Sequence, residues 1–259
     1  MPWLNYASDR PVGHFALITV ALAFTSRYLF VGIEKGGHLF ADVQDWSFSL
    51  HGLNNTAVPG IRAFREHLVS NYVAQANIFR SHVAATALAW TLMPFQIWKT
   101  FRNNDIERHR TMGYFVLACL TIGMVASLFL ARPVREVEAL GGLTSEIGFY
   151  GMAVSTSYCA SMGLYMVKQG CIQEHKQWMV RAYGTIWGAF FWFRIISISV
   201  LPYLPPDKYP HGLGLLANLS WMSGWIGADI ALSLGDSNKK VAFKAQRDAI
   251  AISEEAKKR

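Results

Sequence analysis

The chain has 259 residues and a formal net charge of +7, yet 16% of its residues are charged and 52% are hydrophobic. Soluble domains carry about a quarter charged residues, so this composition argues against a soluble protein and favours a membrane protein. Cys119, Cys159 and Cys171 form no paired motif. We therefore expect no zinc site, covalent haem or disulfide framework.

Six apolar segments are candidates for membrane-spanning helices, each of which needs about 20 mostly apolar residues. The predicted spans are residues 13–33, 82–98, 111–131, 146–167, 182–203 and 213–234. The first contains Arg27, and the second is short and contains Pro94. No cleavable signal pattern precedes the first span, so we expect it to be retained. These segments predict an all-α fold: a polytopic membrane helical bundle of about six transmembrane helices, whose middle four form a four-helix core.

The positions of Lys and Arg predict the orientation of this bundle. With six spans both termini lie on one side, and most of the 24 Lys and Arg residues fall on that side. Basic residues concentrate on the cytoplasmic side of membrane proteins. We therefore expect both termini in the cytoplasm or its equivalent, with the lipid bilayer as partner. Because topology explains the basic excess, no nucleic-acid binding is expected.

Two segments of this single membrane domain, residues 1–259, lie between or beyond the spans. Residues 34–81 form an outer loop, and apolar residues from Ile61 to Tyr72 in it have the spacing of a helix lying on the membrane surface. Residues 235–259 are expected to form a cytoplasmic-side tail helix beginning near Asp236 or Ser237. Both segments are available to contact partners in a membrane complex.

Ionisable residues within or beside the predicted spans need partners or a purpose, because a charge is costly in hydrocarbon. Arg27, Arg194 and Asp229 lie inside spans, and Glu146 and Arg181 stand at span ends. Asp229 and Arg181 fall near one membrane face, which predicts a structural ion pair. Glu146 is the predicted partner of Arg27 or Arg194 near the other face.

Histidines also cluster by membrane face. His109 precedes the third span and His175 the fifth, and these spans run in the same direction, so both imidazoles lie at one face. His82 and His211 form a second couple at the opposite face, and His82 shares a polar helix stripe with Thr86 that should face protein or a cavity. Two imidazoles on facing helices at similar depth are what axial ligation of haem requires. Histidines are also ordinary residues at a charged helix start.

Three segments resemble a known family: "HRTMGY" at residues 109–114, "EHKQWMVRAYGT" at residues 174–185 and "FWFRI" at residues 191–195. Together they resemble the DUF2306 family of predicted multi-pass membrane proteins, over Phe79 to Tyr203. The matching residues are His82, His109, Arg110, Gly113, His175, Trp178, Met179, Arg181, Tyr183 and Arg194. The resemblance implies a histidine-bearing four-helix core like that of distant b-type cytochromes, and no particular activity.

The first functional hypothesis is a haem-binding or quinone-linked redox protein. His109 and His175 would be axial ligands of haem b or a quinone-facing pair, and His82 is a further candidate. Arg110 and Arg181 would balance haem propionates or another anionic group.

Two alternatives stay open from the sequence. A metal-free membrane enzyme of the isomerase or cyclase type could hold a lipid or isoprenoid near Trp187, Trp221 and Trp225, with Asp229 or Glu146 as general acid. A non-catalytic structural or assembly subunit of a membrane complex would use the outer loop and the tail.

Overall fold

The computed structural model is all-helical in the part of the chain that it describes, which comprises residues 42, 45–46, 49–50, 52, 66, 69–70 and 73–257. No strand occurs among these residues, so the predicted all-α class is confirmed. The predicted first span and most of the predicted outer loop, with its surface helix, lie outside the described residues.

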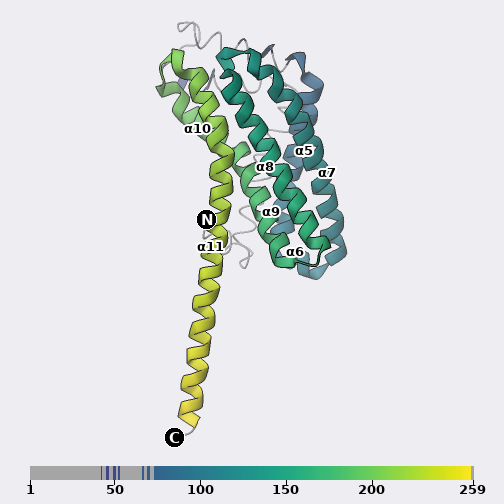
Figure 1. Cartoon of the computed structure of the whole chain (residues 1–259), viewed down its shortest axis with the longest axis vertical. Helices are drawn as coiled ribbons and strands as arrows, with labels where there is room; N and C mark the ends of the chain where they lie inside the picture. The colour runs from purple at the N-terminus through teal and green to yellow at the C-terminus, as the bar shows by residue number, and fades with distance from the viewer. Residues whose placement is uncertain are drawn as a thin grey trace.

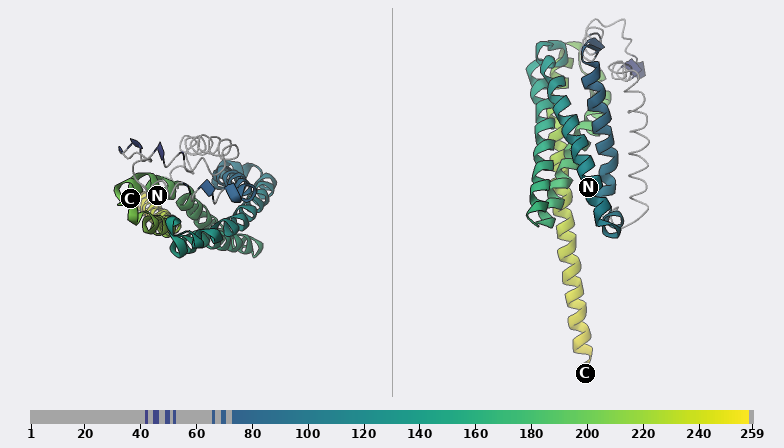
Figure 2. Two further views of the ribbon diagram at one scale, coloured as in Figure 1. Left: turned by 90° about the horizontal axis from the view of Figure 1, so that it is seen from above. Right: turned by 90° about the vertical axis from the view of Figure 1, so that its right-hand side faces the viewer.

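The bundle contains helices α5 (Ala76–Ile97), α7 (Ile106–Ala131), α8 (Gly142–Lys168) and α9 (Ile172–Trp187), side by side in Figures 1 and 2. α9 continues through the π-helical turn η3 (Gly188–Trp192) into α10 (Phe193–Val200). The remaining elements connect these helices or follow them: α6 (Lys99–Asn104), η1 (Arg132–Glu136), η2 (Glu138–Leu140), η4 (Leu201–Tyr203), η5 (Pro206–Lys208) and α11 (Tyr209–Lys257).

α11 packs against α8 and α9 and then extends past the other helices (Figure 1). The helix is continuous from Tyr209 to Lys257. The prediction of a separate tail helix that begins near Asp236 or Ser237 is therefore wrong. The tail is instead the second half of the helix that carries the predicted sixth span.

Two helix starts bring histidines to one end of the bundle. Asp105 caps α7, its Oδ1 accepting a hydrogen bond from the backbone N–H of Arg108 at 2.9 Å. α7 therefore begins before its apolar run and includes His109. α9 likewise begins at Ile172, which places His175 in its first turn. We call this end, where α6 joins α7, the histidine end.

α9 and α11 approach each other closely through small residues. A Cβ atom added to Gly184 or Gly224 would collide with the carbonyl oxygen of the other residue, and one added to Gly188 would collide with the carbonyl oxygen of Ser220. Small residues thus recur every four positions on both helices, from Gly184 to Gly188 and from Ser220 through Gly224 to Ala228. This spacing lets helix backbones pack closely in membranes.

The main core lies between α5, α7, α8 and α9. Trp90 of α5 is fully buried and stacks on Phe190 with ring centroids 4.9 Å apart. The Trp187 ring packs edge-on against the Trp90 indole, with ring centroids 5.6 Å apart. These aromatic contacts join α5 to the π-helical turn and to the end of α9.

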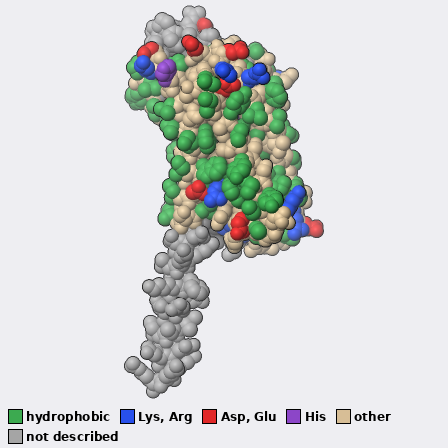
Figure 3. Space-filling view, viewed as in Figure 1, with side chains coloured by type: hydrophobic (Ala, Val, Ile, Leu, Met, Phe, Trp, Pro, Cys, Tyr) green, Lys and Arg blue, Asp and Glu red, His purple; other side chains and the backbone are tan. Residues whose placement is uncertain are grey.

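The outward faces of the helices carry large apolar side chains. Such exposed residues include Phe115, Ile122, Phe129, Ile147, Val154, Leu215, Leu219, Ile226 and Ile230. Figure 3 shows a hydrophobic band on one face, with charged side chains gathered toward the two ends of the described bundle. A contiguous apolar exterior of this kind marks a surface that is covered by lipid or by another protein.

By length and composition, one helix of the described part, Ile106–Glu136, is apolar enough to cross a membrane. α8 has a comparable length but buries hydroxyl residues such as Ser145, Ser155 and Thr156 along its packed face. Such residues lower the apolar content of a helix, and they are common where membrane helices pack against each other.

The close contact between α9 and α11 makes a paired prediction. We expect Gly224→Ala to lower the free energy of unfolding by about 1–3 kcal/mol, because the new methyl group meets the Gly184 backbone. Gly227→Ala is the matched control, since a Cβ atom there has nothing within 4 Å. It should be neutral or raise stability by up to about 1 kcal/mol through helix propensity. Unfolding of both variants in detergent measures the difference, and equal effects would contradict the close contact.

Candidate functional site

His175 is held in a defined orientation at the histidine end. Its Nδ1 lies 2.8 Å from the carbonyl oxygen of Gly163 on α8. A carbonyl oxygen only accepts hydrogen bonds, so Nδ1–H is the donor. In the neutral ring Nε2 then carries the lone pair, and this is how proteins commonly orient an imidazole for metal binding or proton transfer.

His109 lies in the first turn of α7, at the same end of the bundle as His175 in the first turn of α9. The positive charges of Arg102 and Arg110 reach His109. The structure thus places both histidines, which the sequence put at one membrane face, at the same end of the bundle.

Two buried polar atoms at the histidine end have no hydrogen-bond partner among the described residues, His109 Nδ1 and Gln96 Nε2. Gln96 lies beside α7, since its Oε1 would be 3.4 Å from a Cβ atom at Gly113, one turn after His109. Buried polar groups are nearly always hydrogen-bonded, so an unbonded one calls for an explanation. A bound group or water at this end would supply the missing partner.

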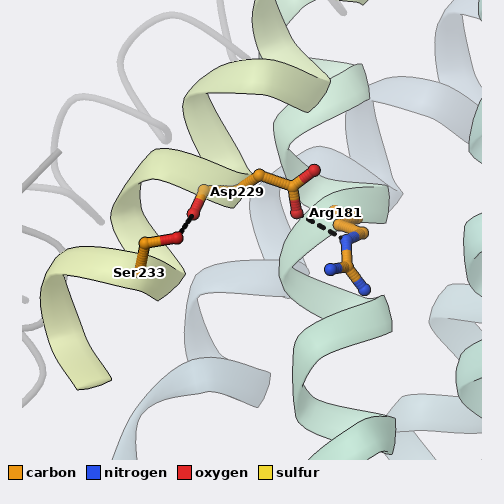
Figure 4. A network of polar contacts seen from close by, with 3 residues as sticks. All are labelled: Arg181, Asp229 and Ser233. Atoms are coloured by element: carbon orange, nitrogen blue, oxygen red, sulfur yellow. Dashed lines mark hydrogen bonds and ion pairs between the residues drawn. The ribbon is translucent and has the colours of Figure 1, made fainter. Parts of the chain in front are cut away.

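Arg181 and Asp229 form the ion pair that the sequence predicted. Arg181 Nε donates to Asp229 Oδ1 at 2.7 Å, joining α9 to α11 (Figure 4). The guanidinium also lies over the Trp178 ring, 4.8 Å from its centroid. Both partners are thus engaged within the protein, which argues against Asp229 as a general acid and against Arg181 as the partner of a cofactor.

Glu146 has a partner that the sequence did not predict. Its buried carboxylate lies 3.9 Å from Arg135 Nε of the turn η1. Gly141 and Gly142, at φ of 89° and 52°, reverse the chain between η2 and α8 and bring η1 alongside the start of α8. Sequence reasoning missed this pair because it depends on that reversal. Arg27, the other predicted partner besides Arg194, lies outside the described residues.

Arg194 is tied to the π-helical turn. Its Nη1 donates to the carbonyl oxygens of Ala189 and Phe190, both at 2.9 Å, and its guanidinium lies 4.7 Å from the Phe190 ring centroid. A π-helical turn disturbs the regular backbone hydrogen bonds, and such turns occur frequently at functional sites. Arg194 therefore stabilises carbonyl groups that lie where the regular helix pattern is broken.

A cavity of about 130 Å³ lies beside this turn, in the half of the bundle away from the histidine end. Its lining is mostly apolar but includes His82 and Arg194. The Nδ1–H of His82 donates to the carbonyl oxygen of Gly123 on α7 at 2.8 Å. The prediction that the stripe of His82 and Thr86 faces protein or a cavity is confirmed, whereas His211, its predicted companion, is exposed on α11.

A helical bundle with an apolar exterior and ionisable side chains packed inside is the architecture of integral membrane proteins. The family model described as "Predicted membrane protein (DUF2306)" matches residues 79–231. The chain therefore belongs to the DUF2306 family and is a membrane protein. This match confirms the resemblance noted from the sequence and extends it beyond Tyr203 into α11. No curated protein and no solved structure matches the chain.

The ion pair between α9 and α11 can be measured with a double-mutant cycle of Arg181→Gln and Asp229→Asn. The side chains are 22% and 43% exposed, so we expect a coupling energy of about 1 kcal/mol, near the upper end for solvent-accessible pairs. Chemical denaturation in detergent provides the free energies of unfolding of the wild type, both single variants and the double variant. Pairing Asp229→Asn with Arg132→Gln, on an exposed turn, should instead give additive effects. Additivity in both cycles would contradict the ion pair.

Proposed function

We propose that this protein is a multi-pass integral membrane protein that binds a redox group, haem b by preference, at its histidine end. The multi-pass part rests on the exposed apolar side chains of α7, α8 and α11. It also rests on helix length, because the 26 residues of α7 and the 27 of α8 each extend about 39–41 Å at 1.5 Å per residue. That is enough to cross roughly 30 Å of hydrocarbon. The cytoplasmic side is proposed to be the side of the membrane that carries both termini and most of the Lys and Arg residues.

The observation that carries the redox part is the placement of His109 and His175 at the same end of the bundle, each in the first turn of its helix. The donor chemistry fits haem iron. His175 has its tautomer fixed by Gly163, which leaves Nε2 available, and His109 has a buried ring nitrogen without a hydrogen-bond partner in the described part of the chain. Neutral imidazole is the usual axial ligand of b-type haem.

The surroundings of the two histidines also suit a bound haem. Met112 and Met179 pack against the core one turn beyond His109 and His175 respectively. Unbranched methionine side chains adapt to the shape of a neighbouring group. Arg102 and Arg110, whose charges reach His109, would hold the propionates. Arg181 is left out of this role because its guanidinium binds Asp229.

A bound haem supplies one-electron transfer. The residues of this chain would orient and insulate the bound group: the Gly163 carbonyl oxygen fixes the His175 ring, and the Gln96 amide would be available for a hydrogen bond. The buried core around Trp90, Val116 and Tyr183 would keep water away from it. Burial of this kind and the hydrogen bond behind a ligand are two ways in which a protein sets a haem potential.

A second candidate function is that of an assembly subunit in a membrane complex. The observation in its favour is α11, which continues to Lys257 beyond the ends of its neighbours (Figure 1). The isomerase or cyclase alternative has less support, because both candidate acids, Asp229 and Glu146, have arginine partners.

The redox proposal predicts a coloured protein. Full-length protein made with an adequate haem supply and purified in mild detergent should show a Soret band and carry iron. We expect His175→Ala to lose most of this absorbance while the protein stays folded, because one axial ligand is gone. His211→Ala is the matched control, since His211 is exposed on α11, and it should keep the spectrum. A folded wild-type protein without colour or iron would overturn the redox proposal.

A further inference from the structure

We propose that the cavity between α5, α7, α8 and the π-helical turn is a binding site for a phenolic ring, of the kind that forms the head of a quinol. This site is separate from the histidine end and does not depend on haem binding there. Neither the family description nor the sequence motifs assign any ligand to it.

Size is the first argument. The cavity has a volume of about 130 Å³. An engineered apolar cavity of roughly 150 Å³ in another protein binds benzene, so a six-membered ring is the right order of size. Four phenylalanines line the cavity, which suits the face and edge of an aromatic ring. They are Phe79, Phe149, Phe190 and Phe193.

The hydroxyl groups in the lining use their hydrogens within the protein. Thr86 donates to the carbonyl oxygen of His82 at 2.6 Å, and Ser127 donates to that of Met124 at 2.7 Å. Thr185, behind the lining, donates to the carbonyl oxygen of Ala182, so in its 2.9 Å contact with Thr156 it must accept. Thr86, Ser127 and Thr156 therefore present oxygen lone pairs to the cavity rather than hydrogens.

His82 adds one more acceptor. Its Nδ1–H is committed to the Gly123 carbonyl oxygen, so Nε2 of the neutral ring carries a lone pair. Arg194 adds a positive charge to the described part of the lining. A phenolic hydroxyl group can donate its hydrogen to His82 Nε2, whereas a carboxylate would bring no hydrogen for this acceptor.

The π-helical turn gives the site its shape. Ala189 and Phe190 belong to this turn and line the cavity, and Arg194 is held by hydrogen bonds to their carbonyl oxygens. This part of the cavity wall is thus fixed before any ligand enters. A pre-organised site costs less entropy on binding than a mobile one.

Binding of phenol and toluene to the purified full-length protein in detergent tests the proposal, because the two rings have similar size and only phenol has a hydroxyl group. Saturable binding is measured by titration calorimetry, with an empty-micelle titration subtracted. We expect phenol to bind about tenfold more tightly than toluene, the effect of one net hydrogen bond near 1.4 kcal/mol. In His82→Phe this preference should fall to about two- to threefold or less.

Cavity-filling variants locate the binding. Ala153→Leu places extra carbon atoms in the lining and should abolish saturable phenol binding, and Ala189→Leu serves the same purpose if the first variant does not fold. Ala118→Leu, on the exposed face of α7, is the matched control and should bind phenol like the wild type. Equal affinities for phenol and toluene, no saturable phenol binding, or unchanged binding in a folded cavity-filling variant would each overturn the proposal.

Discussion

The close contact between α9 and α11 is the constraint on which the other features depend. Glycine at positions 184, 188 and 224 lets the two backbones touch. That approach sets Asp229 within hydrogen-bonding distance of Arg181. It also fixes the π-helical turn, because Gly188 packs on Ser220. The π-helical turn then places Ala189, Phe190 and Arg194 around the cavity. Small residues in the helix contact thus determine where the ionisable residues of α9 and α10 can lie.

In both halves of the bundle, a hydrogen bond to a glycine carbonyl oxygen orients an imidazole. His175 donates from Nδ1 to the carbonyl oxygen of Gly163, and His82 donates from Nδ1 to that of Gly123. In each case the glycine also leaves room for a side chain of the helix that carries the histidine, Met179 in one case and Thr86 in the other. Close helix approach and imidazole orientation are therefore linked. The two histidines differ in surroundings, since arginine charges gather near the histidine end and aromatic rings line the cavity.

The sequence was sufficient for features that depend on helix periodicity and on membrane depth. The all-α class, the pairing of Arg181 with Asp229 and the inward face of His82 and Thr86 follow from which residues share a helix face and which ends share a membrane side. It was insufficient where the backbone departs from a regular helix. The Glu146–Arg135 pair depends on the reversal at Gly141 and Gly142, and the cavity depends on the π-helical turn, for which Arg194 inside an apolar run was the available hint. The prediction of a separate tail helix was wrong because a polar, charged segment can continue the preceding helix, so no new helix start is needed.

The central claim is that His109 and His175 face one bound group within a membrane bundle. The most direct measurement is a density map of the full-length protein in a lipid nanodisc by electron cryomicroscopy, at a resolution that shows side chains. The account predicts flat, haem-sized density between the two imidazoles, with Arg102 or Arg110 at its edge and a lipid belt around α7, α8 and α11. Direct packing of side chains between His109 and His175, with no density between the imidazoles in protein supplied with haem, would contradict it.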